Sequence, residues 1–322
     1  MVRDWAWLNG QWIPAQDLAI PVWDAGFVFG ATVTDLCRTI GHRLFRCSEH
    51  VRRFFASAQL CDIPLAYTET ELTKVAEELV ARQIARLSAW EDLAVVIFAT
   101  PGSVAQYRPI SASPDVADQE QRASRRQEGV GNFLDDSPTL GLHTFRLPLE
   151  RYARLWRTGF RLIRVGQAPE DHIFPRQAKH RSRLYWWRAQ RQVERQQPGA
   201  IALLCDRDGA LLETAFANLV LVFGETLATP SLDRVLHGVS LQVVAELADA
   251  LGCKWQPQNI YPDAVMHAEE AFLTSSSFCL LPVQQIDGKK FRCPGPMAQQ
   301  LLRAWSELAS FDLLAQLAAH DR

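Results

Sequence analysis

A polar stretch near the middle of the chain separates two more apolar parts, and it limits what this sequence can fold into more than any other feature. Residues 103–142 are rich in Gln, Arg, Asp, Ser and Pro and show little hydrophobic periodicity. A connection of this length is uncommon inside a compact domain, so it is either a linker between domains or a loop that folds over a site. At 322 residues the chain also has the length of about two domains. We therefore predict a smaller N-terminal domain over 1–130, which ends in this polar loop, and a larger C-terminal domain over 143–322.

Both parts mix helical and strand-like patterns, which predicts an α/β fold of the mixed α+β kind. Residues 25–40 are rich in β-branched and aromatic residues and are interpreted as one strand. Thr68 followed three residues later by Glu71 predicts a capped helix. Short apolar runs separated by turn residues indicate a β-meander over 200–230, and Ser240 is placed to cap the helix that follows it.

Composition and charge narrow the classes of function. The net charge of −2 gives no electrostatic reason to expect nucleic acid or an anionic membrane as a partner. The longest apolar runs have the length of strands, and no apolar signal segment is visible, so we expect a cytoplasmic protein. The seven cysteines are scattered and contain no C-x-x-C pair, so neither a disulfide framework nor a metal site is expected.

Lysine is rare in this chain, and one lysine has unusual neighbours. Only five of the 34 Lys and Arg residues are lysines, and Lys179 lies in the segment PRQAKHRSRLYWW among arginines, a histidine and two tryptophans. Nearby positive charge, burial and a helix N-terminus all lower the pKa of a lysine amine, which makes it a better nucleophile near neutral pH. The alternative, a solvated lysine at a helix start, is the commoner case for a lysine considered alone. Lys179 by itself therefore marks only a candidate reactive amine.

Two clusters of donors could bind a phosphate group. Gly238, Val239 and Ser240 form a turn that opens a predicted helix, where unpaired backbone amides bind anions well. Ser275 and Ser276 belong to a run of three serines at the end of a predicted strand. Helix capping is the alternative explanation for the first cluster, and a polar loop is the alternative for the second.

A carboxylate is the third candidate site feature, after the amine and the phosphate donors. Glu213 lies in the apolar run ALLETAFANLVLV, where an unpaired carboxylate would be costly. It therefore needs a partner, which is either an arginine or a ligand group such as a protonated pyridine nitrogen. A reactive amine, phosphate donors and a carboxylate for a ring nitrogen together describe a site for pyridoxal 5'-phosphate, so we expect this cofactor.

The sequence also resembles the class IV aminotransferases, which are pyridoxal-phosphate enzymes of fold type IV. The resemblance rests on LNGQWIPAQDLAIPVWDAGFVFG, EHVRRFFASA, AKHRSRL, DGALLETAFANLVLV, LHGVSL and AFLTSSSFCLLPV, which cover nearly the whole chain. It implies a homodimer of two-domain subunits, with the cofactor between the domains and joined to Lys179 as an imine. It also implies that Arg53 holds the phosphate and that Glu213 pairs with the ring nitrogen. The cofactor-binding residues implied are Arg53, Lys179, Glu213, Gly238, Val239, Ser240, Ser275 and Ser276.

Departures from the family pattern bear on the substrate. Thr34-Asp35 replaces the usual aromatic-Glu pair, and Leu184 stands where branched-chain enzymes carry a tyrosine. The strand end at 100–102 lacks the expected arginine. Arg38 matches an arginine of the branched-chain pattern, so Thr34 and Arg38 are the candidate substrate contacts. For Arg38 the alternative is a surface salt bridge with Asp35 or a neighbour.

Three functions remain open. The first is an aminotransferase that moves an amino group between an amino acid, most simply of branched-chain type, and a 2-oxo acid. The second is aminodeoxychorismate lyase, which eliminates pyruvate, because KHRSRL is similar to the lyase pattern K-H-x-N-R-L. The third is a non-catalytic homologue that binds the cofactor, which the altered pocket residues would allow.

Overall fold

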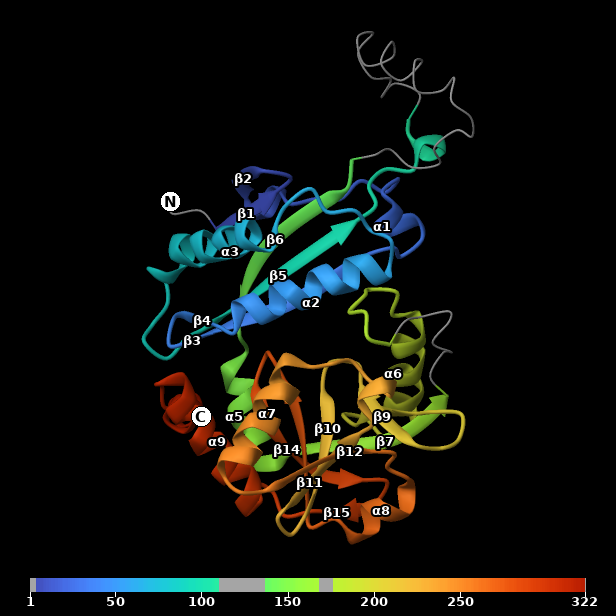
Figure 1. Cartoon of the computed structure of the whole chain (residues 1–322), viewed down its shortest axis with the longest axis vertical. Coiled ribbons are helices and arrows are strands. Elements are labelled where there is room, and N and C mark those ends of the chain that lie inside the picture. Colours follow the sequence, from blue (N-terminus) through green and yellow to red (C-terminus); the bar gives the residue numbers. More distant parts are fainter. Residues whose placement is uncertain (1–3, 110–136, 168–175, 322) are drawn as a thin grey trace.

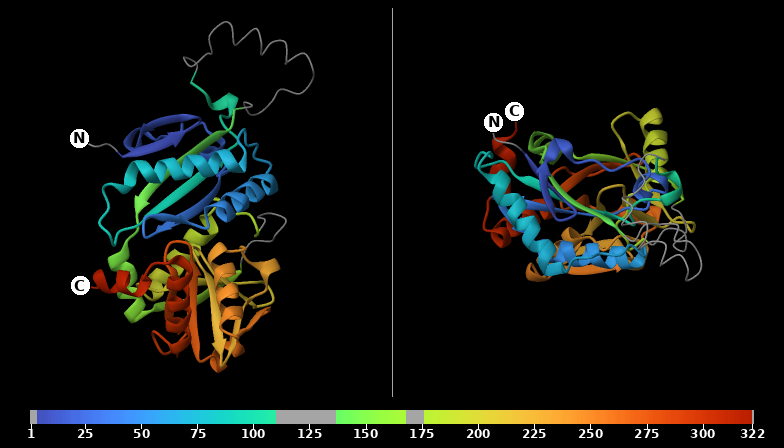
Figure 2. Two further views of the ribbon diagram at one scale, coloured as in Figure 1. Left: turned by 60° about the vertical axis from the view of Figure 1, so that its left-hand side comes forward. Right: turned by 90° about the horizontal axis from the view of Figure 1, so that it is seen from above.

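Two β-sheets, each with its own helices, are stacked along the long axis of the molecule (Figures 1 and 2). The sequence prediction of a mixed α/β fold is confirmed. The chain builds one sheet with its first part and the other sheet with its second part. Most of the predicted polar loop over 103–142 falls on residues 110–136, which lie outside the described residues. This computed structural model describes residues 4–109, 137–167 and 176–321.

The first sheet has six strands in the order β2-β1-β6-β5-β3-β4, and every neighbouring pair is antiparallel. Helices α2 and α3 pack on it, and apolar residues such as Phe54 and Leu72 fill the interface. Thr68 caps α3 in a capping box with Glu71, as predicted. The elements are β1 (Trp5–Leu8), β2 (Gln11–Pro14), α1 (Ala25–Val28), β3 (Val33–Ile40), β4 (Arg43–Phe45), α2 (Cys47–Leu60), α3 (Glu69–Ile84), β5 (Leu93–Thr100) and β6 (Thr139–Arg146).

Two predictions about this part of the chain are corrected. The predicted start of the second domain at residue 143 falls inside β6, which pairs with β5 and β1, so the first sheet extends to Arg146. The segment 25–40 is not one strand, because Asp24 accepts a hydrogen bond from the N–H of Gly26 (2.7 Å) and starts the short helix α1 ahead of β3.

The second sheet has nine strands and is mixed, with the order β12-β11-β10-β13-β14-β7-β8-β9 and β15 paired to β14. Helices α7 and α9 cover β13, and α6 covers β7 and β8. The strands are β7 (Phe160–Gln167), β8 (Ile201–Cys205), β9 (Leu211–Thr214), β10 (Asn218–Phe223), β11 (Thr226–Pro230), β12 (Lys254–Gln258), β13 (Glu270–Ser275), β14 (Cys279–Ile286) and β15 (Lys289–Lys290). The helices are α5 (Leu149–Thr158), α6 (Leu184–Gln196), α7 (Val239–Ala250), α8 (Pro262–His267), α9 (Pro296–Ala309) and α10 (Leu313–Ala319).

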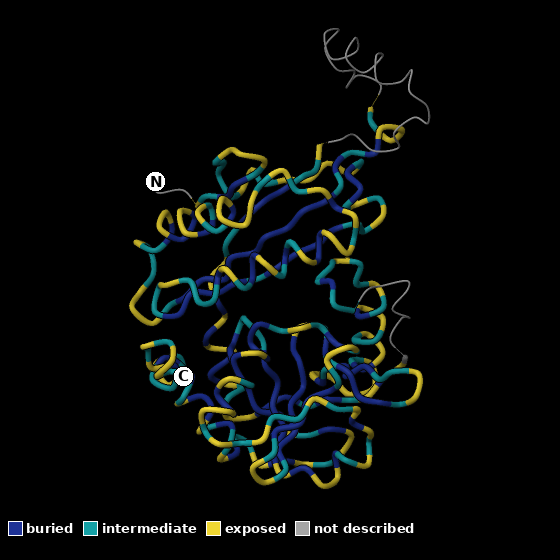
Figure 3. Tube along the Cα trace, viewed as in Figure 1, coloured by how far each residue is buried: buried dark blue, intermediate teal, exposed yellow. Residues whose placement is uncertain are grey.

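Burial follows the strands of both sheets, while the outer sides of the helices are exposed (Figure 3). Each sheet therefore has its own apolar core. Among the described residues, no helix is both long and apolar enough to cross a membrane. The same residues contain no group of three or more His, Cys, Asp or Glu side chains suited to hold a metal ion.

Candidate active site

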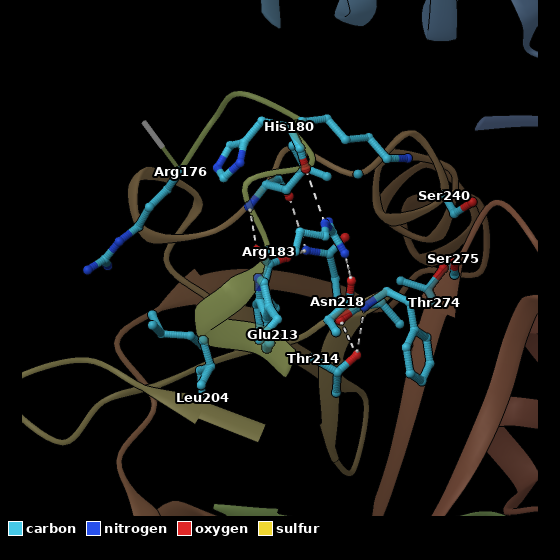
Figure 4. Close-up of a pocket in the computed structure, with 18 of the residues that line it drawn as sticks. Arg176, His180, Arg183, Leu204, Glu213, Thr214, Asn218, Ser240, Thr274 and Ser275 are labelled. Atoms are coloured by element: carbon cyan, nitrogen blue, oxygen red, sulfur yellow. Dashed lines mark hydrogen bonds between the residues drawn. The ribbon is translucent and has the colours of Figure 1, made fainter. Parts of the chain in front are cut away.

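An open cavity lies beside the ends of β9, β10 and β13 and the start of α7 (Figure 4); the empty space of about 900 Å³ includes solvent at its mouth. The segment before α6 forms another side, and Arg53 of α2 reaches it from the first domain. Of the eight predicted cofactor residues, all but Val239 line this cavity. Val239 is the first residue of α7 and lies between two lining residues. The structure thus brings together residues that are far apart in the sequence: Arg53, Lys179, Glu213, Gly238, Ser240, Ser275 and Ser276.

The backbone of Lys179 is held by the first domain. Its N–H donates to Oγ of Ser57 in α2 (3.0 Å), and its carbonyl accepts from the N–H of Thr34 in β3 (2.8 Å). His180 extends this pairing through a β-bridge to Val33. Because the backbone N–H and the backbone carbonyl of Lys179 are both hydrogen-bonded, its side chain starts from a fixed point on the cavity wall.

The amine of Lys179 has an unusually low pKa for a lysine. Burial is the largest cause and contributes to lowering the pKa from 10.5 to about 8. Asp35 opposes the shift, with Oδ1 3.8 Å from Nζ, while Arg53 and Arg183 add to it. Burial is thus a larger cause than the neighbouring arginines, which are the more visible feature of the sequence. At pH 7 a pKa of about 8 leaves about a tenth of the amine unprotonated, far more than for an ordinary lysine, and this fraction can act as a nucleophile or base.

Asp35 is a fully buried carboxylate in β3 that organises the cavity from the first domain. It accepts from Nε of Arg53 (2.8 Å) and from Nη2 of Arg53 (2.9 Å), and Nδ1 of His50 lies 2.8 Å from Oδ1. Burial alone would raise the pKa of Asp35, but Arg53, Lys179 and His50 together hold it well below its usual range. Asp35 is therefore ionised, which orients His50 with its Nδ1–H toward the carboxylate.

Glu213, the third residue of β9, carries the second carboxylate of the site. It accepts from Nδ2 of Asn218 (2.9 Å) and from the N–H of Leu236 (3.3 Å). Burial raises the pKa of Glu213 from 4.5 to about 7, against the N–H of Leu236 and the charge of Arg183. A carboxylate whose ionised form is disfavoured in this way gains most from a cationic ligand group.

The start of α7 offers backbone amides to the cavity. Gly238 is the N-cap and no side chain caps the helix, so the prediction that Ser240 caps it is wrong; Ser240 is the second residue of the helix. A Cβ at position 238 would clash with Oδ1 of Asn218, so only glycine fits there. Nη1 of Arg53 donates to the carbonyl of His237 (3.0 Å), which brings its guanidinium beside this helix start. Uncapped amides next to an arginine are an arrangement that can bind an anion.

A turn that contains serines also contributes to the cavity wall, and we call it the serine turn. The turn of residues 276–278 joins β13 to β14, and Ser275 and Ser276 line the cavity. Oγ of Ser276 lies 3.4 Å from Nε2 of His50, so the pair connects the turn to Asp35. Hydroxyl and amide donors thus face the cavity from two elements of the second domain.

Comparison with known proteins agrees with this geometry. The family profile described as amino-transferase class IV matches residues 32–286. The chain belongs to the class IV aminotransferases. Members of this family are pyridoxal-phosphate enzymes.

Individual relatives of this class IV aminotransferase are distant but match along its length. The D-alanine aminotransferase of Bacillus licheniformis is 23% identical over 299 residues, which is 92% of this chain and 94% of that protein. The branched-chain amino acid aminotransferase of Escherichia coli superposes with a TM-score of 0.78 at 20% identity and covers 95% of this chain and 94% of that one. The branched-chain amino acid aminotransferase of Thermoproteus uzoniensis, solved with norvaline, gives a TM-score of 0.77 at 20% identity over 99% of this chain and 97% of that one. The structural matches confirm fold type IV.

The structure does not bring the two predicted substrate residues of this class IV aminotransferase into the cavity. Oγ1 of Thr34 donates to the carbonyl of Ile97 (2.9 Å) and accepts from Nη2 of Arg181 (3.3 Å). Arg38 is 3% exposed and forms a buried ion pair with Asp92 at 3.3 Å. The alternative of a surface salt bridge with Asp35 or a neighbour is also wrong, because the ion pair is buried and its acid is Asp92. Four residues along a strand span about 13 Å, which carries Arg38 away from the Lys179 end of β3.

Sequence reasoning missed several residues of the site. His50 was not singled out, although it lies one helical turn before Arg53 and so shares its face of α2. Asp35 was noted only as a departure from the family pattern. Arg183 lines the cavity and donates through Nε to the carbonyl of His180 (3.1 Å), but in the sequence it was one of several arginines.

Proposed function

We propose that this protein uses pyridoxal 5'-phosphate to move an amino group between an amino acid and a 2-oxo acid, with Lys179 as the covalent anchor and proton carrier. The observation that carries the proposal is the convergence on one cavity of an amine with a lowered pKa, a carboxylate with a raised pKa and a helix start beside an arginine. These are the three kinds of group that the cofactor needs from a protein.

The residues present fit the cofactor. Arg53, the amides of Gly238, Val239 and Ser240, and the donors of Ser275 and Ser276 would hold the phosphate. Glu213 would accept a proton shared with the ring nitrogen, because a cation there offsets the desolvation that raises its pKa. When bound, the cofactor supplies an electron sink for carbanion chemistry at the α-carbon of an amino acid.

The proton transfer falls to Lys179. In the protein itself its free amine has a pKa of about 8, so as a free amine it could take the α-proton of an amino acid and later return one. Burial keeps Nζ near this pKa, and the fixed backbone keeps it at one place on the cavity wall. The same side chain therefore serves as nucleophile, base and acid.

The substrate class is proposed to be an apolar amino acid of branched-chain type. Apolar residues contribute to the cavity lining, among them Trp186, Leu204, Leu212 and Phe216. The test is a half-reaction screen of L- and D-amino acids, read by the absorbance of the bound cofactor. We expect branched-chain amino acids to change the spectrum fastest and a 2-oxo acid to restore it. A spectrum that no amino acid changes would instead identify a non-catalytic cofactor-binding homologue.

A second candidate is aminodeoxychorismate lyase. Arg183 occupies the arginine position of the lyase-like pattern, and the structure places its side chain in the cavity. Release of pyruvate from aminodeoxychorismate without any 2-oxo acid would favour the lyase. Strict dependence of turnover on a 2-oxo acid would exclude it.

We also propose a homodimer, formed through an apolar surface beside the site. Phe27 of α1 is 70% exposed, and Leu184 and Trp187 of α6 are 72% and 63% exposed. The end of α1 and the start of α6 are adjacent, because Oγ of Ser182 donates to the carbonyl of Gly30 (2.7 Å). Exposed apolar side chains gathered on one face are typical of an interface. Sedimentation of the wild type should give a mass of twice the 36.3 kDa of the chain. The Trp187→Glu variant should shift the protein toward monomer. A monomeric wild type would contradict the dimer.

A further inference from the structure

Arg38 joins three parts of the molecule at one buried point. It extends from β3, and its guanidinium forms an ion pair with Asp92, which is fully buried just before β5. Nη2 also donates to Oε1 of Gln316 in α10 (3.3 Å). Ion pairs in such surroundings require that nearly every polar atom be matched, so the position of this guanidinium is closely defined.

Asp92 fixes the orientation of that guanidinium. The carboxylate accepts from Oγ1 of Thr39 (2.6 Å), from the N–H of His42 (3.0 Å) and from Nε2 of Gln316 (2.7 Å). These donors hold Asp92 without help from Arg38. The guanidinium therefore has a rigid carboxylate beside Nη2, and its Nη1 is available to another part of the molecule.

Nη1 of Arg38 reaches the serine turn of the second domain. Nη1 of Arg38 donates to the carbonyl of Ser277 (3.3 Å) and contacts Sγ of Cys279 (3.6 Å). Ser277 is the middle residue of the turn 276–278, directly after the two serines that line the cavity. A charged group from the first sheet thus holds the backbone of a turn in the second.

The backbone that follows the turn is strained. Cys279, the first residue of β14, has a φ of 60°, a left-handed conformation that a residue with a side chain rarely adopts. Within the turn, the N–H of Phe278 donates to the carbonyl of Ser275 (3.2 Å), and Oγ1 of Thr274 donates to the carbonyl of Cys279 (2.7 Å). The Ser277 carbonyl is the group that Arg38 holds from outside.

We propose that Arg38 is a positioning residue that holds the Ser277 carbonyl so that Ser275 and Ser276 present their donors to the phosphate group of the cofactor. This inference rests on the proposed function, since it assumes that the cavity binds pyridoxal 5'-phosphate. Arg38 touches neither substrate nor cofactor; it acts through the turn. Its effect should therefore be specific to the phosphate and should not extend to the pyridine ring.

The test compares Arg38→Met with wild type for binding of pyridoxal 5'-phosphate and of pyridoxal, which lacks the phosphate. We expect the affinity for pyridoxal 5'-phosphate to fall about ten-fold, the effect of losing one charge-assisted hydrogen bond, while the affinity for pyridoxal stays unchanged. An unchanged ratio of the two affinities would overturn the role of Arg38. Failure of the wild type to bind pyridoxal 5'-phosphate would instead overturn the proposed function.

Gln316→Leu is the matched control. It damages the same buried network but makes no contact with Ser277, so the affinity ratio should equal that of wild type. A Gln316→Leu ratio that falls as far as that of Arg38→Met would show a general loss of packing and would also overturn the inference. If Arg38→Met does not fold, Arg38→Lys replaces it, because a lysine keeps the charge beside Asp92 but lacks the fork that reaches Ser277 as well.

Discussion

Replacing Lys179 with Ala should abolish amino transfer and the visible absorbance of the bound cofactor. The variant loses the covalent anchor and the base together, so we expect the rate to fall by at least about 10³-fold. The measurement is the single-turnover rate with an amino donor, followed by absorbance.

The fold should survive this change. The Lys179 amine lies 3.8 Å from Asp35, beyond hydrogen-bond distance, and its backbone bonds to Ser57 and Thr34 do not need the amine. The thermal unfolding midpoint of Lys179→Ala should therefore stay close to that of wild type, and added primary amines should restore part of the rate. A variant that keeps wild-type activity would refute the assignment of Lys179.

The second large effect is expected for Glu213→Gln. A neutral side chain beside the ring nitrogen no longer favours its protonation, so we expect the rate of amino transfer to fall about 10²- to 10³-fold. Lys179 remains, so the cofactor should still attach. Retention of cofactor binding with loss of rate separates this variant from Lys179→Ala.

Without cofactor, Glu213→Gln should stabilise the fold, although the same substitution lowers the rate of amino transfer. The pKa of Glu213 is raised from 4.5 to about 7, so between these pH values the folded protein binds more protons than the unfolded chain. The free energy of unfolding of the wild type therefore falls as the pH rises through this window. Glu213→Gln lacks this titration, and its advantage over wild type should grow to the order of 1–3 kcal/mol above pH 7. Urea unfolding of both apo proteins at about pH 4 and about pH 8 checks the sign; a difference that does not grow with pH would mean that burial does not destabilise the Glu213 carboxylate.

A site residue could be predicted from the sequence when it stood out within its own segment. Lys179 and Glu213 each stand out from their own segment, one as a rare amine among arginines and the other as an acid in an apolar run. The anion site at 238–240 also follows from a local pattern, a glycine that opens a helix. In these cases the chemistry of a few neighbouring residues is enough.

The remainder depended on contacts that no local pattern encodes. Alternation along β3 indicates which side chains share a face, but not that Arg38 meets Asp92 and a turn from the other domain. In the same way, the sequence assigns residues 139–142 to the polar loop, whereas in the structure they belong to β6, which pairs with β5 across a long connection. The buried set of Asp35, His50 and Arg53 needs α2 to be docked on β3 before it exists.

The attachment of the Lys179 backbone to β3 and α2 has a thermodynamic consequence for the whole chain. Lys179, the proposed anchor of the cofactor, is tied to β3 and α2 beside the first sheet, whereas Glu213 and the start of α7 belong to the part of the chain that builds the second sheet. A cofactor bound to all of them is a cross-link between two folding units, and its binding free energy adds to the free energy of separating them. The holoenzyme should therefore unfold as one cooperative unit over a range of conditions in which the apo protein unfolds domain by domain.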